Sequence, residues 1–174
     1  MLLRALLFAP HYIVIAVWSV LALPALAVAW LALLIEGRLP AWLQRFLGAY
    51  VRYTGQTSAW FNLLSGRYPD PLHTLEHPFA IDVPDRPPQQ RLTTLARPVL
   101  AVPALILASV LRVVLSVSAV GAWFTALALG RTTAGLQELG TFCLRYELET
   151  EAYVLLLTAR YPRLAPPDVS PVTE

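Results

Sequence analysis

A set of short motifs between Ala29 and Pro69 occurs twice in this chain, and the duplication decides its architecture. The first copy contains Ala29-Trp30, Gly37-Arg38, Leu43-Gln44, Arg52-Tyr53 and Arg67-Tyr68-Pro69. The second copy, at one constant offset and without a gap, contains Ala122-Trp123, Gly130-Arg131, Leu136-Gln137, Arg145-Tyr146 and Arg160-Tyr161-Pro162. The match extends back to Arg4 with Arg97, and roughly a third of the aligned positions are identical. Self-similarity at a fixed offset indicates a duplicated structural unit.

The composition indicates a membrane protein. Apolar residues make up 57% of the chain and charged residues 14%, whereas a soluble domain carries roughly a quarter charged residues. Residues 5–35 contain no charge, and residues 98–129 contain only Arg112. Apolar stretches of about 18 residues or more predict transmembrane helices. We therefore predict an all-α integral membrane protein.

The first apolar stretch also resembles a secretory signal peptide. It follows Arg4 and contains Ala25-Leu26-Ala27, which has the form of a cleavage site. Its repeat partner lies in the middle of the chain, where a signal peptide cannot be. We therefore expect the first helix to remain in the mature protein.

Each unit is expected to be a long apolar transmembrane helix followed by an amphipathic helix lying in the membrane interface. Proline suits a first helical turn and glycine a helix end, which sets the expected bounds. The amphipathic helices place apolar residues on one side at helical spacing, typical of interfacial helices, although this side could instead pack onto protein. The predicted segments are unit 1 at 1–69, with helices 10–35 and 41–64, and unit 2 at 97–162, with helices 103–129 and 134–159.

The remaining segments have a different character. Residues 70–96 form a proline-rich linker of mixed charge, in which 79–83 alternates apolar and polar residues and predicts one short strand. Residues 163–174 form an irregular tail with several prolines.

The number of membrane crossings depends on the amphipathic helices. Arg145, Glu147, Glu149 and Glu151 would each cost about 2.5–3.5 kcal/mol at the centre of a bilayer. We therefore favour two crossings, with inverted units, a cytoplasmic linker and both termini outside. The alternative is four crossings, with linker and termini cytoplasmic, which requires the polar sides of the amphipathic helices to face each other within a bundle.

Several motifs resemble a bacterial membrane family known as domain-of-unknown-function family 4389. They are Pro10-His11-Tyr12-Ile13-Val14, the repeated motifs above, His77-Pro78-Phe79-Ala80-Ile81-Asp82-Val83-Pro84 and Ala152-Tyr153-Val154-Leu155-Leu156-Leu157-Thr158. The resemblance covers most of the chain as two tandem copies. The sequence departs from the family pattern at three positions. Asp70 and Arg163 follow the proline of the two Arg-Tyr-Pro motifs, and Ala104 stands in the second copy where the first copy has His11. The resemblance implies no catalytic residues.

No catalytic, cofactor or metal site is expected. The three histidines are His11, His73 and His77, and the prolines around the last two disfavour a shared helix face. The single Cys143 excludes an intramolecular disulfide. No phosphate-binding loop or nucleophile motif occurs. The residues that we single out as candidate contacts with lipid headgroups or a partner are Arg52, Tyr53, Arg145, Tyr146 and the intramembrane Arg112.

These features predict a non-enzymatic accessory or scaffold protein, multi-pass in the inner membrane of a bacterium. All thirteen basic residues are Arg, as in proteins from GC-rich bacterial genomes. Its partners would be membrane lipids and a membrane protein or a second copy of itself; the net charge of +2 with scattered arginines argues against nucleic acid. The alternative is a component of a transport or channel assembly, in which Arg112 is functional within the membrane.

Overall fold

The computed structural model describes residues 2–71 and 91–164, and within them the chain forms four α-helices and no strand. The helices are α1 (Leu2–Glu36), α2 (Ala41–Phe61), α3 (Arg91–Leu129) and α4 (Ala134–Val154). The all-α prediction is thereby confirmed for this part of the chain. The expected strand at 79–83 and the tail from residue 165 lie outside the described residues.

Both long helices begin earlier than the sequence predicts. α1 begins at Leu2 rather than at residue 10, and α3 begins at Arg91 rather than at residue 103. A proline inside a helix removes one hydrogen bond and crowds the preceding turn. Here the prolines occupy exposed positions, where a helix can bend without disturbing its packing. These positions are Pro10, Pro24, Pro98 and Pro103.

A glycine ends the long helix of each unit, as the Gly-Arg motifs predict. Gly37 and Gly130 have φ values of 69° and 68°, in the left-handed region that a glycine adopts without strain. Their backbone N–H groups donate to Leu33 and Ala126 respectively, both at 3.0 Å. This is the usual geometry of a glycine helix end, and it reverses the chain into α2 and α4.

A leucine with positive φ ends each amphipathic helix. Leu63 has φ 63° and Leu156 has φ 64°, a conformation that costs a non-glycine residue roughly 1–2 kcal/mol. As a result α2 ends at Phe61 and α4 at Val154. The sequence predicts later ends, at residues 64 and 159, because leucine gives no signal for a left-handed turn.

After this turn, each unit folds back along its own amphipathic helix. The N–H of Asp70 donates to Oε1 of Gln56 at 3.2 Å. In the second unit, the N–H of Arg163 donates to Oε2 of Glu149 at 3.1 Å. These are equivalent positions of the two copies, so the returning segments belong to the repeated fold.

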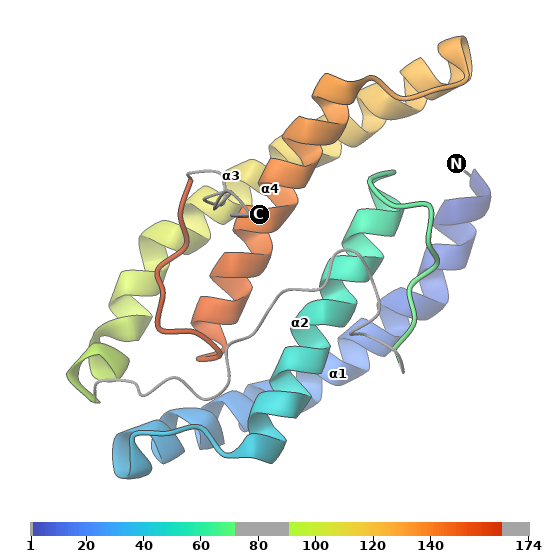
Figure 1. The fold of residues 1–174 in the computed structure, drawn as a ribbon. Helices are drawn as coiled ribbons and strands as arrows, with labels where there is room; N and C mark the ends of the chain where they lie inside the picture. Colours follow the sequence, from blue (N-terminus) through green and yellow to red (C-terminus); the bar gives the residue numbers. More distant parts are fainter. Residues whose placement is uncertain (1, 72–90, 165–174) are drawn as a thin grey trace, which may run out of the picture.

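The two units pack in opposite directions. The turns at Gly37 and Gly130 lie at opposite ends of the bundle (Figure 1). α2 and α4 run antiparallel and touch at Gly55 and Leu148, which are equivalent positions of the two copies. A Cβ on Gly55 would lie 2.9 Å from Cδ1 of Leu148, so any side chain at this position would force Leu148 to move. An approximate two-fold axis therefore passes through the crossing and relates two inverted units.

The amphipathic helices supply most of the core, and the apolar helices supply the surface. Fully buried side chains on α2 and α4 include Leu43, Leu47, Val51 and Leu144. By contrast, only 11% of the most apolar window of α1 and 22% of that of α3 are buried. Both windows, within 6–36 and 93–128, are long and apolar enough to cross a membrane. A soluble helical bundle has the opposite distribution, with its apolar sides turned inwards.

Candidate functional site

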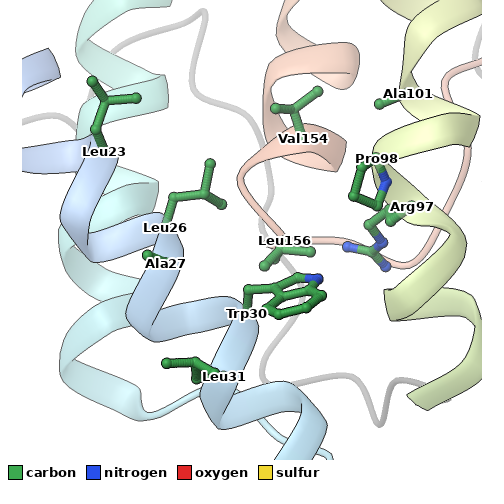
Figure 2. A pocket seen from close by; sticks show the side chains of 10 residues that line it. All are labelled: Leu23, Leu26, Ala27, Trp30, Leu31, Arg97, Pro98, Ala101, Val154 and Leu156. Carbon is green, nitrogen blue, oxygen red and sulfur yellow. The ribbon is translucent and has the colours of Figure 1, made fainter.

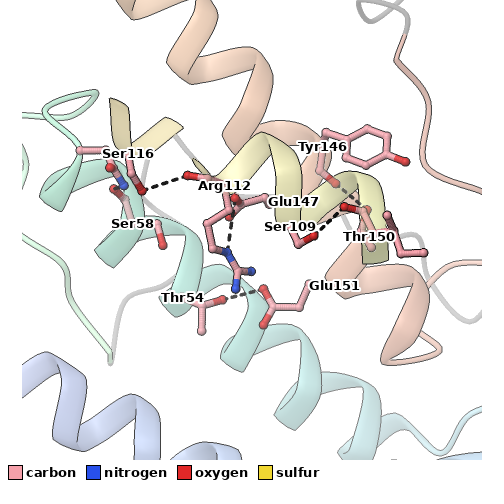
Figure 3. Close-up of polar contacts among 11 residues, drawn as sticks. Thr54, Ser58, Ser109, Arg112, Ser116, Tyr146, Glu147, Thr150 and Glu151 are labelled. Carbon is pink, nitrogen blue, oxygen red and sulfur yellow. Dashed lines mark hydrogen bonds and ion pairs between the residues drawn. The ribbon is translucent and has the colours of Figure 1, made fainter. Parts of the chain in front are cut away.

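Polar side chains meet where α2, α3 and α4 come together (Figure 3). Arg112 extends from α3 towards α4, and its Nε lies 3.4 Å from Oε1 of Glu147. One turn along α4, Oε2 of Glu151 accepts a 3.0 Å hydrogen bond from the hydroxyl of Thr54 on α2. This cluster connects the two units, since α2 belongs to the first copy and both α3 and α4 to the second.

The charge of Arg112 acts on both carboxyl groups of the cluster, and its guanidinium pairs with the carboxyl group of Glu147. Desolvation raises the pKa of Glu147, against the opposing charge of Arg112. Desolvation by the surrounding helices raises the pKa of Glu151 to about 7, against the Thr54 hydrogen bond and the Arg112 charge. Two acids beside one arginine are balanced in charge only when one acid keeps its proton. The cluster can therefore take up and release a proton near neutral pH.

Arg112 is paired rather than isolated. Its side chain is 71% exposed, while that of Glu147 is 9% exposed, so the arginine reaches over a buried carboxylate from the edge of α3. Its equivalent in the first unit, Ser19, instead lies 2.8 Å from the hydroxyl of Tyr50. The two copies therefore differ in charge at this position, although each makes a polar contact there with the neighbouring helix.

The repeated Arg-Tyr pairs lie largely inside the protein. Tyr53 is 1% exposed and Tyr146 is 2% exposed, so both rings pack against protein. The half-buried Arg145 forms a 3.6 Å ion pair with a glutamate one turn along α4. The half-buried Arg52 lies with its guanidinium over Gly48. Of these four candidate contact residues, only the arginines reach the surface.

A histidine near the start of the first apolar stretch, on α1, is buried against the protein. His11 is 6% exposed, and its Nδ1 lies 2.6 Å from the hydroxyl of Tyr53. The rings of Trp60 and Tyr68 lie 6.1 and 4.7 Å from the imidazole. The sequence carries a weak signal of this site, because the second unit has alanine here and so lacks the contact.

A cavity of about 600 Å³ lies between α1, α3 and the end of α4 (Figure 2). Its walls are apolar except for Arg97, which is the one charged residue of the lining. The indole N–H of Trp30 donates to the backbone oxygen of Thr94 at 3.2 Å and ties α1 to α3 beside the cavity. The remaining lining residues are Leu23, Leu26, Ala27, Leu31, Pro98, Ala101, Val154 and Leu156.

Arg97 makes the same contacts as its repeat partner Arg4. Nη1 of Arg97 donates to the backbone oxygen of Tyr153 at 3.4 Å, and its guanidinium lies 4.7 Å from the Tyr153 ring centre. Arg4 does the same with Trp60, at 2.8 and 5.3 Å. The only sequence signal for this contact is that both copies have an arginine at the same aligned position. It indicates duplication but says nothing of the cavity, which forms only when the units pack.

Within residues 2–71 and 91–164, no three His, Cys, Asp or Glu side chains gather so as to hold a metal ion. His73 and His77 lie outside the described residues. Cys143 is buried, with its side chain in the hydrophobic core.

Comparison with known proteins identifies the family. The family described as Domain of unknown function (DUF4389) matches residues 1–73 and 91–165, most of the chain. The two matches correspond to the two copies seen in the sequence and in the fold. The chain therefore belongs to this family, as two tandem copies. No curated protein and no solved structure matches it.

Proposed function

We propose that this member of the family is a non-enzymatic accessory or scaffold protein of a bacterial inner membrane, which holds lipid or a partner protein there. The observation that carries the proposal is the distribution of apolar surface. Most of the exposed large hydrophobic side chains lie on α1 and α3, while charged and hydroxyl side chains of α2 and α4 meet between the units. Soluble monomers rarely expose apolar patches beyond a few hundred Å².

Neither a soluble core helix nor a signal peptide accounts for both apolar helices. The core helix of a soluble protein would be mostly buried, and the apolar windows of α1 and α3 are not. A signal peptide accounts for a helix near the N-terminus but not for α3, which begins at Arg91. A lipid environment removes the exposed apolar area from water at roughly 25 cal/mol per Å².

In the proposed arrangement, α1 and α3 cross the membrane in opposite directions, and α2 and α4, which run back along them, cover their protein-facing sides. The opposite placement of the Gly37 and Gly130 turns supports this (Figure 1). A four-crossing protein built from two helical hairpins would carry both turns on one side. The chain would then be multi-pass.

Fractionation followed by crosslinking tests the proposal. We expect the protein in the membrane fraction after an alkaline carbonate wash, and co-purifying lipid or a crosslinked protein after extraction in mild detergent. A protein that stays soluble without detergent would contradict the membrane assignment. A strictly monomeric protein that carries neither lipid nor partner would contradict the scaffold role.

A transport or channel component is the second candidate, favoured by the inverted units and by the polar cluster between them. Arg112, Glu147 and Glu151 together provide a group that can gain and lose a proton. Proton flux into proteoliposomes, compared between the wild type and Arg112→Leu, separates the candidates. Flux that disappears in the variant supports transport, whereas absent flux, or flux that the substitution leaves unchanged, removes it.

A further inference from the structure

The cavity between α1, α3 and α4 has one polar end and one apolar end. Arg97 and Trp30 lie close to helix ends, since α3 begins at Arg91 and α1 ends at Glu36. Leu23 and Ala101 lie further towards the middle of their helices. Both helices are the candidate membrane spans. The polar end therefore faces the level of the lipid headgroups, and the apolar end extends towards the bilayer centre.

Arg97 is a buried charge with few partners. Its side chain is 3% exposed, it makes one long hydrogen bond to Tyr153, and its Nε has no acceptor among the described residues. No carboxylate of the described chain pairs with it. A guanidinium has five N–H donors, and a buried charge without a counter-ion is costly. Figure 2 shows the guanidinium pointing towards Leu156 and Trp30.

We propose that this cavity binds an anionic phospholipid, with one acyl chain in the apolar part and the phosphate on Arg97. The inference rests on the proposed membrane location. A volume of about 600 Å³ suits a ligand rather than a few waters. Arginine binds phosphate through its planar fork of donors. The phosphate supplies the missing acceptors, and the acyl chain fills a cavity that water would occupy poorly.

The duplication provides a matched control. Arg4 makes the same contacts with Trp60 that Arg97 makes with Tyr153, yet it does not line this cavity. Arg4→Gln therefore removes an equivalent arginine without touching the lipid site. Ala27→Trp does the converse, because it fills the cavity from an exposed position on α1 and leaves Arg97 in place.

Native mass spectrometry of the full chain in detergent, with added phosphatidylglycerol or phosphatidylcholine, tests the site. We expect wild type and Arg4→Gln to bind phosphatidylglycerol about tenfold more tightly than phosphatidylcholine, from one charge-assisted contact. Arg97→Gln should lose the preference, and Ala27→Trp should lose binding of both lipids. Inorganic phosphate should not compete.

Each contrary result has a distinct meaning. Equal binding in wild type, Arg97→Gln and Ala27→Trp would overturn the lipid site while leaving the membrane location intact. Competition by inorganic phosphate would overturn the lipid as occupant and leave a free-anion site. If Arg97→Gln fails to fold, Ala27→Trp still decides. Carbonate-washed fractions of the same variants test the membrane location separately.

Discussion

At the scale of the residue, Glu151 makes stability depend on pH. Its pKa is raised from 4.5 to about 7 in the fold. Between these values the folded state holds a proton that the unfolded state has released, so the free energy of unfolding falls as pH rises through this range. Below this range Glu151 is protonated in both states, so it no longer lowers the free energy of unfolding.

Glu151→Gln is therefore expected to flatten the pH profile and to stabilise the protein above pH 7. The gain is limited to about 2 kcal/mol, because the side chain is only partly buried and solvent screens its charge. Thermal unfolding in detergent at about pH 5 and pH 8 measures this. Glu138→Gln, at an exposed position of the same helix, is the control and should keep the wild-type profile. A Glu151→Gln profile as steep as that of the wild type would contradict the assignment.

A second prediction compares equivalent tyrosines. Tyr53→Phe leaves Nδ1 of the buried His11 without its 2.6 Å partner, which should lower the free energy of unfolding by about 1–3 kcal/mol. Tyr146→Phe should cost less, since Ala104 stands where His11 would be. Unfolding in mixed detergent micelles measures both. Equal losses in the two variants would show that the histidine contact contributes nothing.

Single residues are predictable from this sequence where repetition makes them visible. The Arg-Tyr pairs stand out because they recur. Their burial cannot be predicted from the sequence, because it depends on which helix covers them. Arg97 repeats Arg4 and His11 has no counterpart in the second copy, but neither observation predicts what surrounds these side chains. Their environments are made by Tyr53 and Tyr153, distant in sequence, and by the packing of helices that periodicity alone cannot pair.

At the scale of the element, the crossing of α2 and α4 depends on the lack of a side chain at Gly55. Gly55→Ala would place a Cβ 2.9 Å from Cδ1 of Leu148, a buried side chain. Overpacking of this kind costs about 1–3 kcal/mol. Gly135→Ala is the matched control, because nothing lies within 4 Å of its added Cβ.

Unfolding of both variants in detergent tests the crossing, and Leu148→Ala combined with Gly55→Ala should recover part of the loss. If Gly55→Ala were as stable as Gly135→Ala, the two helices would not approach as closely as the structure has them. In the sequence alone, Gly55 is only a residue that weakens a helix. Its role becomes visible only when the second copy lies against it.

The ends of the helices show what local sequence can predict. The glycine turns are predictable because glycine has a specific backbone preference. The starts of α1 and α3 are not, because exposed prolines are tolerated inside these helices. The ends of α2 and α4 are not either, since a leucine in the left-handed region gives no compositional signal.

At the scale of the whole molecule, the sequence predicts two copies of one unit and leaves their packing open. Identical motifs in both copies are compatible with parallel or inverted packing. The structure has them antiparallel, with the polar sides of α2 and α4 meeting at the Thr54–Glu151 contact. Arg112 reduces the electrostatic cost of burying Glu147, and the raised pKa of Glu151 reduces the cost of burying that side chain.

The proposed membrane location of two inverted units is tested most directly by reporter fusions after residues 38, 85, 131 and 170 in bacterial cells. We predict cytoplasmic signals from the fusions after residues 38 and 85 and external signals from those after 131 and 170. The reason is that the segment between the two apolar stretches is rich in arginine, and such segments stay on the cytoplasmic side. Fusions after 38 and 131 that report the same side of the membrane, or four cytoplasmic signals, would contradict it.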